Sequence, residues 1–586
     1  MTTIIDELTA VVSSAFSACD FDGSLGMVTV SDRPDLCQFQ CNGALAGAKI
    51  YRCAPRAIAQ KVADELEKNP IFQEVSVVNP GFINLTAADT YLVERANVIM
   101  RDDCMGIPQG SPDEKILLDY GGANAAKPLH VGHLRPAVIG EALKRMARVT
   151  GRQVYGDVHM GDWGLQFGLV IASMEEMNPN WRCFQDDFNP EVDVIPPIYV
   201  SDLNEIYPAA SKRRKEDSAF DRRAHEITFA LQNGHPGYRA LWKEIMAASI
   251  PDMKSAYDRL NVSFDFWYGE SDAKPYIEEL IRILWDKNLL HESQGALVVD
   301  VERETDTYSI PPVIIQKSDK SFMYATTDLA TILMREKTLQ PDAIWYVVDK
   351  RQAVHFEQVF RCAKKAGLVP DTTELAHLAN GTMNGKDGRP YKTRDGGVMQ
   401  LCDLCDQVGE AISEKLSDSA FSSDEEKKKT TEILSTAVIK FGDLINHREK
   451  DYVFDIDKFT ASEGKTGVYL LYTVTRLNSI LRKAEQPSED LQPLEKIFSD
   501  TERQLVLDIL LYPTEFERAY ADRAPNYICE QIYTIASDFS KFYHDNHILS
   551  EPDPVKRDHW LNLCKFTRKI MISLLDIMGI ETVEFM

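Results

Sequence analysis

DYGGANAAKPLHVGHLRPAVIGEAL, residues 119–143, contains a strand end, a loop of small residues and a helix start. The apolar run KILLDY predicts a strand that ends near Asp119. Helical periodicity from Leu134 to Met146 predicts an amphipathic helix that opens around Val131. A strand, a loop and a helix in this order form the first half of a βαβ unit. The stretch therefore predicts a parallel sheet with crossover helices.

The same alternation continues along the middle of the chain. Strand-type runs RQVYGDV, PPVIIQ and AIWYVV alternate with helical patterns. We therefore predict a Rossmann-type α/β domain over residues 111–403. A polar, charge-rich stretch at about 175–260 breaks the alternation and is predicted to be an insertion into this domain.

The two flanking regions have different patterns. Residues 1–110 mix an amphipathic stretch, Ala57–Leu66, with the β-rich run VSVVNPGFINL, and predict a small α/β domain. Residues 404–586 lose the strand pattern and carry helical stripes, with a capping box of Ser499 and Glu502, which predicts a helical bundle. The fold class is multidomain α/β.

Composition limits the function classes. A chain of 586 residues that is 44% hydrophobic and 26% charged can bury several cores. Its net charge of −25 argues against general affinity for nucleic acid, so any RNA binding must depend on local sites. The basic runs at 212–215 and 427–429 are as typical of solvated helix faces and decide nothing alone.

Cysteine usage and the apolar runs indicate the compartment. Eleven scattered cysteines form no disulfide framework, which is typical of a reducing compartment. The N-terminal segment lacks a secretory pattern, and no run of about eighteen apolar residues predicts a membrane span. We expect a cytoplasmic protein without membrane contact. Cys402 and Cys405 form an isolated C-x-x-C, so we predict no zinc and no protein metal site.

His130 and His133 are predicted to lie at a helix N-terminus. Unpaired backbone N–H groups and the helix dipole attract anions there, and two imidazoles add donors. Gly132 allows a flat base to approach the backbone. The pattern indicates a nucleotide-phosphate site, although two histidines that only cap a helix would give the same H-x-G-H.

The stretch resembles the HIGH signature of class I aminoacyl-tRNA synthetases, and more narrowly the N-x-A-K-P-x-H-x-G-H-L-R form of arginyl-tRNA synthetases. GDWGLQFG, YGESD, YATTDLA, DKRQAVHFEQVF, GVYLLYTVTRLNSILRK, VNPGFINL and the terminal MGIETVEFM resemble further segments of that family, in the same order. The resemblance covers nearly the whole chain. Departures from the family pattern at Ala123, Pro136 and Leu165 affect the fine geometry but remove no charged contact.

The resemblance implies an arginine site. A guanidinium carries five donors in a plane, so a selective site needs carboxylates placed for forked hydrogen bonds. Helical periodicity places Tyr324 and Asp328 on one face of a helix. By resemblance, the residues that contact L-arginine are Asp119, Asn124, Glu270, Tyr324, Asp328 and Gln352. Such a site would reject lysine strongly, so no editing domain is expected.

The resemblance also implies an ATP site with two elements. The first comprises Lys127, His130, Gly132 and His133. The second is the glycine-rich, basic loop GTMNGKDGRPYKTRDGG, which matches the family's K-T-R-x-G variant of the K-M-S-K-S loop and supplies Lys392, Thr393 and Arg394. Lys127, Lys392 and Arg394 would stabilise the charge of the departing pyrophosphate, with Mg²⁺ bridging the triphosphate. The arginine carboxylate would attack the α-phosphate, and the 2′-hydroxyl of the terminal adenosine of tRNA(Arg) would then accept the arginyl group.

For tRNA, the resemblance assigns the N-terminal domain to the D-loop corner and the helical domain to the anticodon. Candidate contacts are Asn79, Phe82 and Asn84 in the first, and Tyr469, Tyr472 and Arg476 in the second. Phe82 is suited to stack on an unpaired base, or else it is a core phenylalanine; packing is also the ordinary role of the two tyrosines.

Two other functions remain open from the sequence. A small-molecule nucleotidylyltransferase can share H-x-G-H on a similar sheet, but it would not need the helical third. A catalytically silent tRNA-binding relative would not need His130, His133, Glu270, Asp328 and Lys392. We expect a monomer.

Overall fold

The computed structural model describes residues 2–33, 35–318, 320–389, 391, 399–417, 421–485 and 490–586. The chain divides into two compact units. Unit 1 comprises Met1–Gly110, Leu416–Ile433 and Ala461–Met586, and unit 2 comprises Ser111–Lys415 and Leu434–Thr460. None of the described helices combines the length and the apolar character that crossing a membrane requires.

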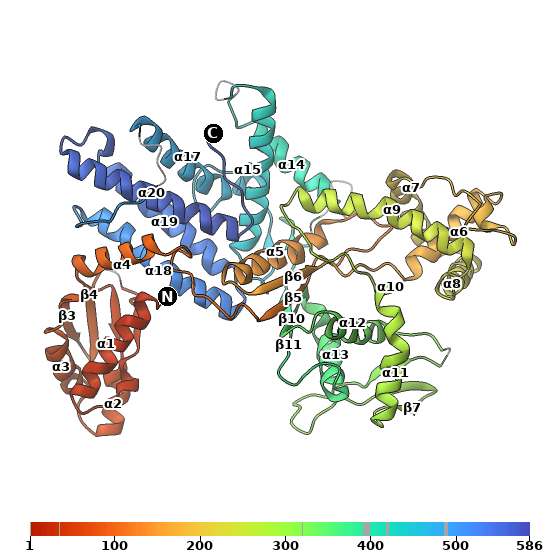
Figure 1. Ribbon diagram of the computed structural model, residues 1–586, viewed down its shortest axis with the longest axis horizontal. Coiled ribbons are helices and arrows are strands. Elements are labelled where there is room, and N and C mark those ends of the chain that lie inside the picture. The colour runs from red at the N-terminus through yellow and green to blue at the C-terminus, as the bar shows by residue number, and fades with distance from the viewer. Residues whose placement is uncertain are drawn as a thin grey trace. The chain divides into compact units, whose positions relative to one another are not determined.

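The first part of unit 1 is an antiparallel sheet in the order β1-β2-β4-β3, with helices packed on it (Figure 1). Its strands are β1 (Val28–Val30), β2 (Phe39–Cys41), β3 (Phe72–Val78) and β4 (Phe82–Ala87). Its helices are α1 (Ile4–Ala18), α2 (Gly43–Tyr51), α3 (Pro55–Leu66) and α4 (Asp89–Arg101). Val78 pairs with Phe82, so the predicted turn at Pro80–Gly81 joins a hairpin. The predicted amphipathic helix is α3, whose start at Pro55 suits a residue without an N–H.

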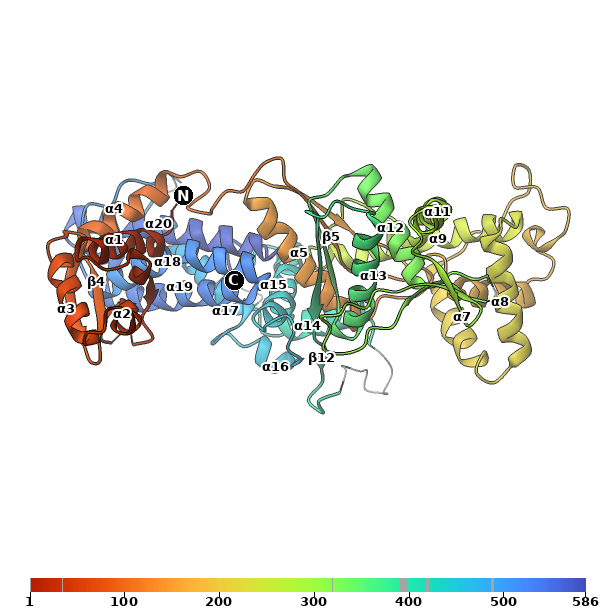
Figure 2. The same cartoon turned by 90° about the horizontal axis from the view of Figure 1, so that it is seen from below.

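The second part of unit 1 is a bundle of long helices that lie side by side in both views (Figures 1 and 2). They are α17 (Gly467–Lys483), α18 (Asp500–Asp522), α19 (Asn526–Asp545) and α20 (Pro554–Ile577). The predicted cap of α18 is present, since the Glu502 N–H donates to Ser499 Oγ at 3.3 Å. The return half of the predicted box is wrong: the Glu502 carboxylate accepts from the Phe498 N–H and Trp560 Nε1 instead. Two side chains of α20, His559 and Trp560, also contact this buried carboxylate and hold it away from the Ser499 N–H.

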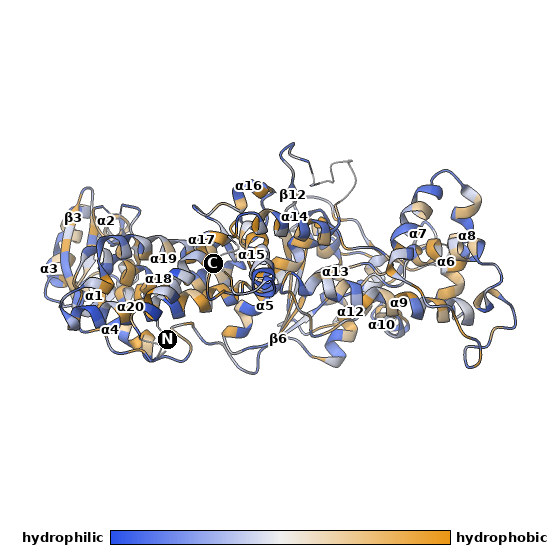
Figure 3. Ribbon diagram, turned by 90° about the horizontal axis from the view of Figure 1, so that it is seen from above, coloured by the Kyte–Doolittle hydropathy of each residue, from blue (hydrophilic) through white to orange (hydrophobic). Residues whose placement is uncertain are grey.

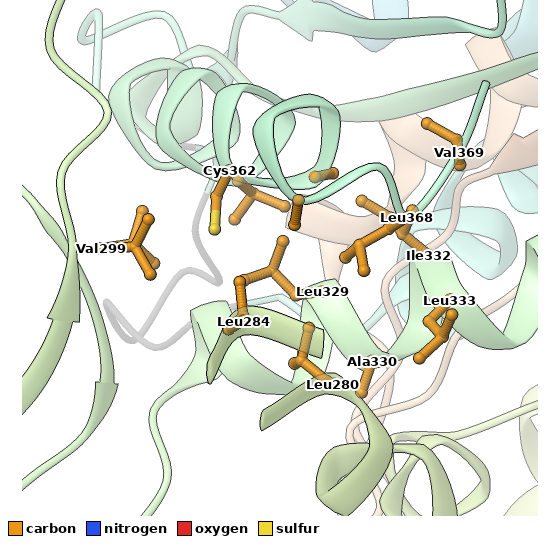
Figure 4. Close-up of a cluster of buried hydrophobic side chains, with 14 of the residues drawn as sticks. Leu280, Leu284, Val299, Leu329, Ala330, Ile332, Leu333, Cys362, Leu368 and Val369 are labelled. Atoms are coloured by element: carbon orange, nitrogen blue, oxygen red, sulfur yellow. The ribbon is translucent and has the colours of Figure 1, made fainter. Parts of the chain in front are cut away.

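Unit 2 contains the predicted parallel sheet, in the order β11-β10-β5-β6. Its strands are β5 (Lys115–Asp119), β6 (Gln153–Asp157), β10 (Ala343–Asp349) and β11 (Glu374–Asn380). The connections include α5 (Leu134–Val149), α12 (Tyr324–Thr338) and α13 (Ala353–Ala366). Figure 4 shows Leu329 and Ile332 of α12 in one buried cluster with Cys362 of α13. This core fixes α12 and α13 on the sheet; predicted site residues lie on the first turns of α12 and immediately before α13.

One predicted strand pairs differently. PPVIIQ contains β9 (Val313–Gln316), which joins β7 (His291–Ser293) and β8 (Ala296–Val299) in a separate antiparallel sheet. A short apolar run fits either sheet, because its sequence does not specify the pairing partner. Unit 2 also contains the short α10 (Glu270–Ala273), with α11 (Ile277–Asp286), β12 (Met383–Asn384), β13 (Tyr452–Val453), α14 (Leu401–Ser413) and α16 (Ile456–Phe459). Helix α15 (Asp424–Leu444) belongs to unit 2 from Leu434 on.

The predicted polar insertion is helical. It follows α6 (Leu165–Met177) and contains α7 (Val200–Arg213), α8 (Ser218–Gln232) and α9 (Pro236–Asp258). Figure 3 colours α6 largely as hydrophobic and gives α7 hydrophilic stretches. Leu203 of α7 and Phe220 and Ile227 of α8 are buried, so the insertion has an apolar core.

Candidate active site

The carboxyl ends of β5 and β6 carry two carboxylates that share one arginine. Nη2 of Arg335, from α12, donates to Asp119 Oδ2 and to Asp157 Oδ2, each at 2.7 Å. All three side chains are buried. Burial raises the pKa of the Asp119 carboxyl, and Arg335 opposes that shift. Asp119, a predicted arginine contact, is thus engaged through one oxygen, and Arg335 and Asp157 are site residues that the sequence reasoning missed.

His130 and His133 cap each other at the start of α5. The helix opens at the predicted place, as a 3₁₀ turn over Val131–His133 that continues into α5. Nδ1 of His130 accepts the Gly132 N–H at 3.0 Å, and Nδ1 of His133 accepts the His130 N–H at 3.0 Å. The two rings lie 4.0 Å apart between centroids.

These contacts fix the protonation of the pair. Burial lowers the pKa of His130, and burial lowers the pKa of His133 to about 3. Both rings are therefore neutral at physiological pH. Since each Nδ1 accepts a hydrogen bond, the proton of each ring resides on Nε2. The histidines offer two N–H donors and no positive charge.

The segment after the predicted second ATP element lies beside the first. Lys392, Thr393 and Arg394 lie outside the described residues. The described residues begin again at Met399. The Val131 N–H donates to Met399 O at 3.0 Å, and the Leu401 N–H donates to Leu129 O at 2.9 Å. Residues 399–401, which follow the K-T-R sequence, therefore lie against the H-V-G-H segment.

Lys127 contacts the insertion. Its Nζ lies 4.6 Å from the centroid of the Tyr207 ring on α7. The charge of Lys127 contributes to the lowered pKa values of His130 and His133, so it acts within electrostatic range of both imidazoles.

Two acidic side chains, Asp162 and Asp328, lie within electrostatic range of Glu270, the first residue of α10. The Glu270 N–H donates to Met160 O at 3.0 Å, which fixes α10 beside the G-D-W-G segment. Burial raises the pKa of Glu270 to about 7; His159 opposes the shift, and Asp162 and Asp328 add to it. No hydrogen bond reaches the Glu270 carboxylate from the residues that the structure describes. An unpaired, partly buried carboxylate beside two others is suited to bind a cation.

Asp328 and Tyr324 lie on the first turns of α12, as predicted. Asp328 Oδ2 lies 2.6 Å from His355 Nε2 of α13. Tyr324 is 70% exposed, and burial together with the charge of Glu270 raises the pKa of its hydroxyl. Gln352 is exposed at the residue before α13. Glu270 thus lies within electrostatic range of both Tyr324 and Asp328. His355 is a partner of Asp328 that the sequence reasoning missed, although it belongs to the DKRQAVHFEQVF segment that also contains Gln352.

Asn124 lies next to the G-D-W-G segment. It forms a bridge with Gly161, and the Ala125 N–H donates to Gly161 O at 3.1 Å. A Cβ at residue 161 would lie 2.3 Å from Asn124 Oδ1, so any larger residue would displace the Asn124 side chain. The N-A-A-K-P and G-D-W-G motifs are therefore adjacent.

The predicted tRNA contacts lie in unit 1. Asn79 is exposed in the β3–β4 turn and accepts from Arg56 Nη1 at 3.1 Å, and Phe82 is half-buried. Asn84 is buried, and its Oδ1 accepts from Gln40 Nε2 at 2.9 Å.

In the bundle, Tyr472 is exposed on α17 and its hydroxyl accepts from Arg476 Nη2 at 2.7 Å. The Tyr469 hydroxyl lies 3.1 Å from Ser540 Oγ of α19. Tyr472 and Arg476 form one surface cluster, and Tyr469 is half-buried beside α19.

Three family models match the chain. Residues 2–87 match the arginyl tRNA synthetase N terminal domain, residues 96–456 match the catalytic domain of tRNA synthetases class I (R), and residues 470–586 match the DALR anticodon binding domain. The chain is 45% identical over 589 residues to an arginine–tRNA ligase of Alkaliphilus oremlandii, with 100% of both chains covered. It is 44% identical over 597 residues to one of Agathobacter rectalis, also with full coverage.

Solved structures share the fold. The arginyl-tRNA synthetase of Plasmodium falciparum superposes with a TM-score of 0.81 at 22% identity, and that of Thermus thermophilus with 0.80 at 20%. In both comparisons 100% of each chain is covered.

Proposed function

Because the chain belongs to the class I arginyl-tRNA synthetases and so is an arginine–tRNA ligase, we propose that Glu270, Tyr324 and Asp328 bind the guanidinium of its arginine substrate. The observation that carries this assignment is the unpaired Glu270 carboxylate with its pKa raised to about 7 beside Asp328. A bound guanidinium supplies the missing positive charge and planar donors. Lysine offers a point charge and leaves part of this hydrogen-bonding capacity unused.

The remaining contacts to arginine come from Asn124, Gln352 and Asp119. Asp119 Oδ2 already holds Arg335, so Oδ1 is the atom left for the α-ammonium group. Asn124 belongs to the first of the two motifs that border the site and bridges Gly161 of the second, and Gln352 precedes the helix that carries His355.

ATP binds through the two elements of the predicted nucleotide site. The neutral His130 and His133 donate Nε2–H to phosphate oxygens, and Gly132 allows the adenine to approach the backbone. Lys127, Lys392, Thr393 and Arg394 contact the pyrophosphate that leaves. The proposed role of the last three rests on the sequence pattern alone.

Magnesium accompanies the triphosphate. In the described part of the chain, no group of three or more His, Cys, Asp or Glu side chains is placed to hold a metal ion. The proposed Mg²⁺ binds oxygens of the triphosphate, as is usual for this ion with nucleotide substrates. When bound, it neutralises phosphate charge.

The reaction needs no protein nucleophile. A carboxylate oxygen of arginine attacks the α-phosphate, the bond to the β-phosphate breaks, and arginyl-adenylate and pyrophosphate form. The 2′-hydroxyl of the terminal adenosine of tRNA(Arg) then attacks the arginyl carbonyl, loses its proton and displaces AMP. The protein contributes position and electrostatic stabilisation.

tRNA contacts are proposed at two sites, each in unit 1. One comprises Asn79, Phe82 and Asn84, and the other comprises Tyr469, Tyr472 and Arg476. A cytoplasmic monomer is the proposed state. The cytoplasmic location is supported by eleven free cysteines.

The test is aminoacylation of total tRNA with each of the twenty amino acids in labelled form, with ATP and Mg²⁺. We expect arginine alone to be attached, and Asp328→Asn to abolish the reaction. Asp286→Asn, at an exposed position of α11, is the matched control and should retain full activity. Undiminished arginine charging by Asp328→Asn would contradict the proposed site.

A further inference from the structure

The insertion reaches the lysine of the first ATP element. The Lys127 ammonium lies 4.6 Å from the centroid of the Tyr207 ring, within the range of a cation–π contact. Both side chains are half-buried. No carboxylate of the described chain lies within ion-pair distance of Lys127, and the Tyr207 hydroxyl has no hydrogen bond to described residues. The ring is thus the partner that the structure gives this lysine.

The backbone before Lys127 is held by the same insertion. The Ala126 N–H donates to Ser249 Oγ of α9 at 3.1 Å, and Ser249 is buried. Ala126 has a φ of 63°, a left-handed conformation that costs an alanine about 1 kcal/mol or more. One small cavity is lined jointly by Ala126 and Lys127, by Leu203 of α7 and by Ser249 of α9, so both helices of the insertion border this segment.

Helix α9 also holds the G-D-W-G motif. Nε1 of Trp242 donates to Asp162 O at 2.8 Å, and Nε2 of Gln232, at the end of α8, donates to Trp163 O at 2.9 Å. The insertion therefore contacts both motifs that border the site, and its position is fixed relative to Lys127.

We propose that Tyr207 is a positioning residue that holds the Lys127 ammonium beside the His130–His133 pair, where it meets the pyrophosphate that leaves ATP. The proposal rests on the role of Lys127 given under Proposed function. A free lysine side chain has many rotamers, and ordering it costs up to about 2 kcal/mol on the usual side-chain entropy scale. Contact with the Tyr207 ring orders the Lys127 side chain before ATP binds, so less conformational entropy is lost when ATP binds.

The first experiment is pyrophosphate exchange with tRNA present, on Tyr207→Leu, Tyr207→Phe and Lys127→Met. We expect Tyr207→Leu to lower kcat by roughly three- to thirty-fold, the range of a cation–π contact, with KM for arginine unchanged. Tyr207→Phe keeps the aromatic ring and should retain near-normal activity. Tyr199→Leu, an exposed tyrosine before α7, is the matched control.

A double-mutant cycle separates positioning from folding. In the Lys127→Met background, Tyr207→Leu should have no further effect, because the ring then has no ammonium to hold. An equal loss in both backgrounds, or a gain of activity in Tyr207→Leu, would overturn the proposal. If Lys127→Met is itself fully active, the proposed role of Lys127 fails and not merely the role of Tyr207.

A second measurement does not depend on catalysis. The Lys127 charge contributes to the lowered pKa of His130, so NMR titration of a histidine-labelled protein reports where that charge lies. Tyr207→Leu should raise the pKa of His130 in the same direction as Lys127→Met. An unchanged His130 titration in Tyr207→Leu would show that the ring does not hold the ammonium.

Discussion

His355 Nε2 lies 2.6 Å from Asp328 Oδ2, and both side chains are about one quarter exposed, at 27% and 24%. The contact joins the first turns of α12 and α13 and orients the carboxylate that is proposed to bind arginine. A hydrogen bond to a charged group contributes about 1.5–3 kcal/mol. We expect His355→Phe to raise KM for arginine by roughly tenfold and to change KM for ATP little, as steady-state aminoacylation would measure.

The control for this prediction is a surface pair of the same kind. His291 lies 3.6 Å from Asp300, with side chains that are 48% and 65% exposed. His291→Phe should leave KM for arginine unchanged. An equal effect of both substitutions would mean that His355 acts through general stability.

The raised pKa of Glu270 predicts how the affinity for arginine depends on pH. Its pKa is about 7 in the free protein because burial disfavours the charged form. A guanidinium favours the charged form, so the pKa falls on binding and a proton is released. Affinity should therefore rise with pH, by up to about tenfold between pH 6 and 8, and then level off above the free pKa.

Calorimetry in buffers of different ionisation enthalpy measures this proton release directly. Glu270→Gln should weaken arginine binding and remove the pH dependence below pH 8. Glu292→Gln, at an exposed position of β7, should behave as wild type. Proton uptake on binding would contradict the assignment.

The lowered pKa of His133 predicts that its ring acts as a neutral hydrogen-bond donor and not as a cation. Its pKa is lowered to about 3 by burial, so the ring is neutral, and Nδ1 accepts the His130 N–H. His133→Gln can still donate an N–H and should retain more kcat than His133→Ala, which we expect to lose about 10²-fold. With both substrates saturating, kcat should not decline as pH rises from 6 to 8. A decline centred near pH 6.5 would show that a protonated imidazole is required.

The sequence predicted the elements that depend on local patterns. Residues 119–143 gave a strand, a loop and a helix because apolar periodicity is local, and β5 and α5 lie where they were expected. The pairing of PPVIIQ was wrong because pairing depends on distant partners. The second half of α15 packs with unit 2, although its apolar stripe is equally typical of a helical bundle.

The site residues also divide into those that a local motif indicates and those that depend on distant parts of the chain. Glu270, Tyr324 and Asp328 were named because each lies in a recognisable motif, and the structure brings them within electrostatic range of one another. Arg335 was missed because an arginine in the last turn of a helix is usually solvated and favours the helix dipole. Its burial results from two strands that end beside α12, which no local pattern indicates.

Replacing Arg335 is predicted to lower the free energy of unfolding strongly. Its Nη2 bonds Asp119 and Asp157, and Arg335→Met would leave two buried carboxylates without a positive charge. Removing one partner of a buried ion pair costs about 3–5 kcal/mol. Hydrogen exchange of peptides from β5 and β6, measured in increasing urea, should show unfolding at lower urea than in wild type.

The control and the rescue follow from the same geometry. Arg351→Met, at a side chain that is 79% exposed and pairs with Asp349, should change stability by less than about 0.5 kcal/mol. Adding Asp157→Asn to Arg335→Met removes one of the unpaired charges and should recover part of the loss. If Arg335→Met is as stable as wild type, the ion pairs of Arg335 with Asp119 and Asp157 contribute no net stability, and this prediction fails.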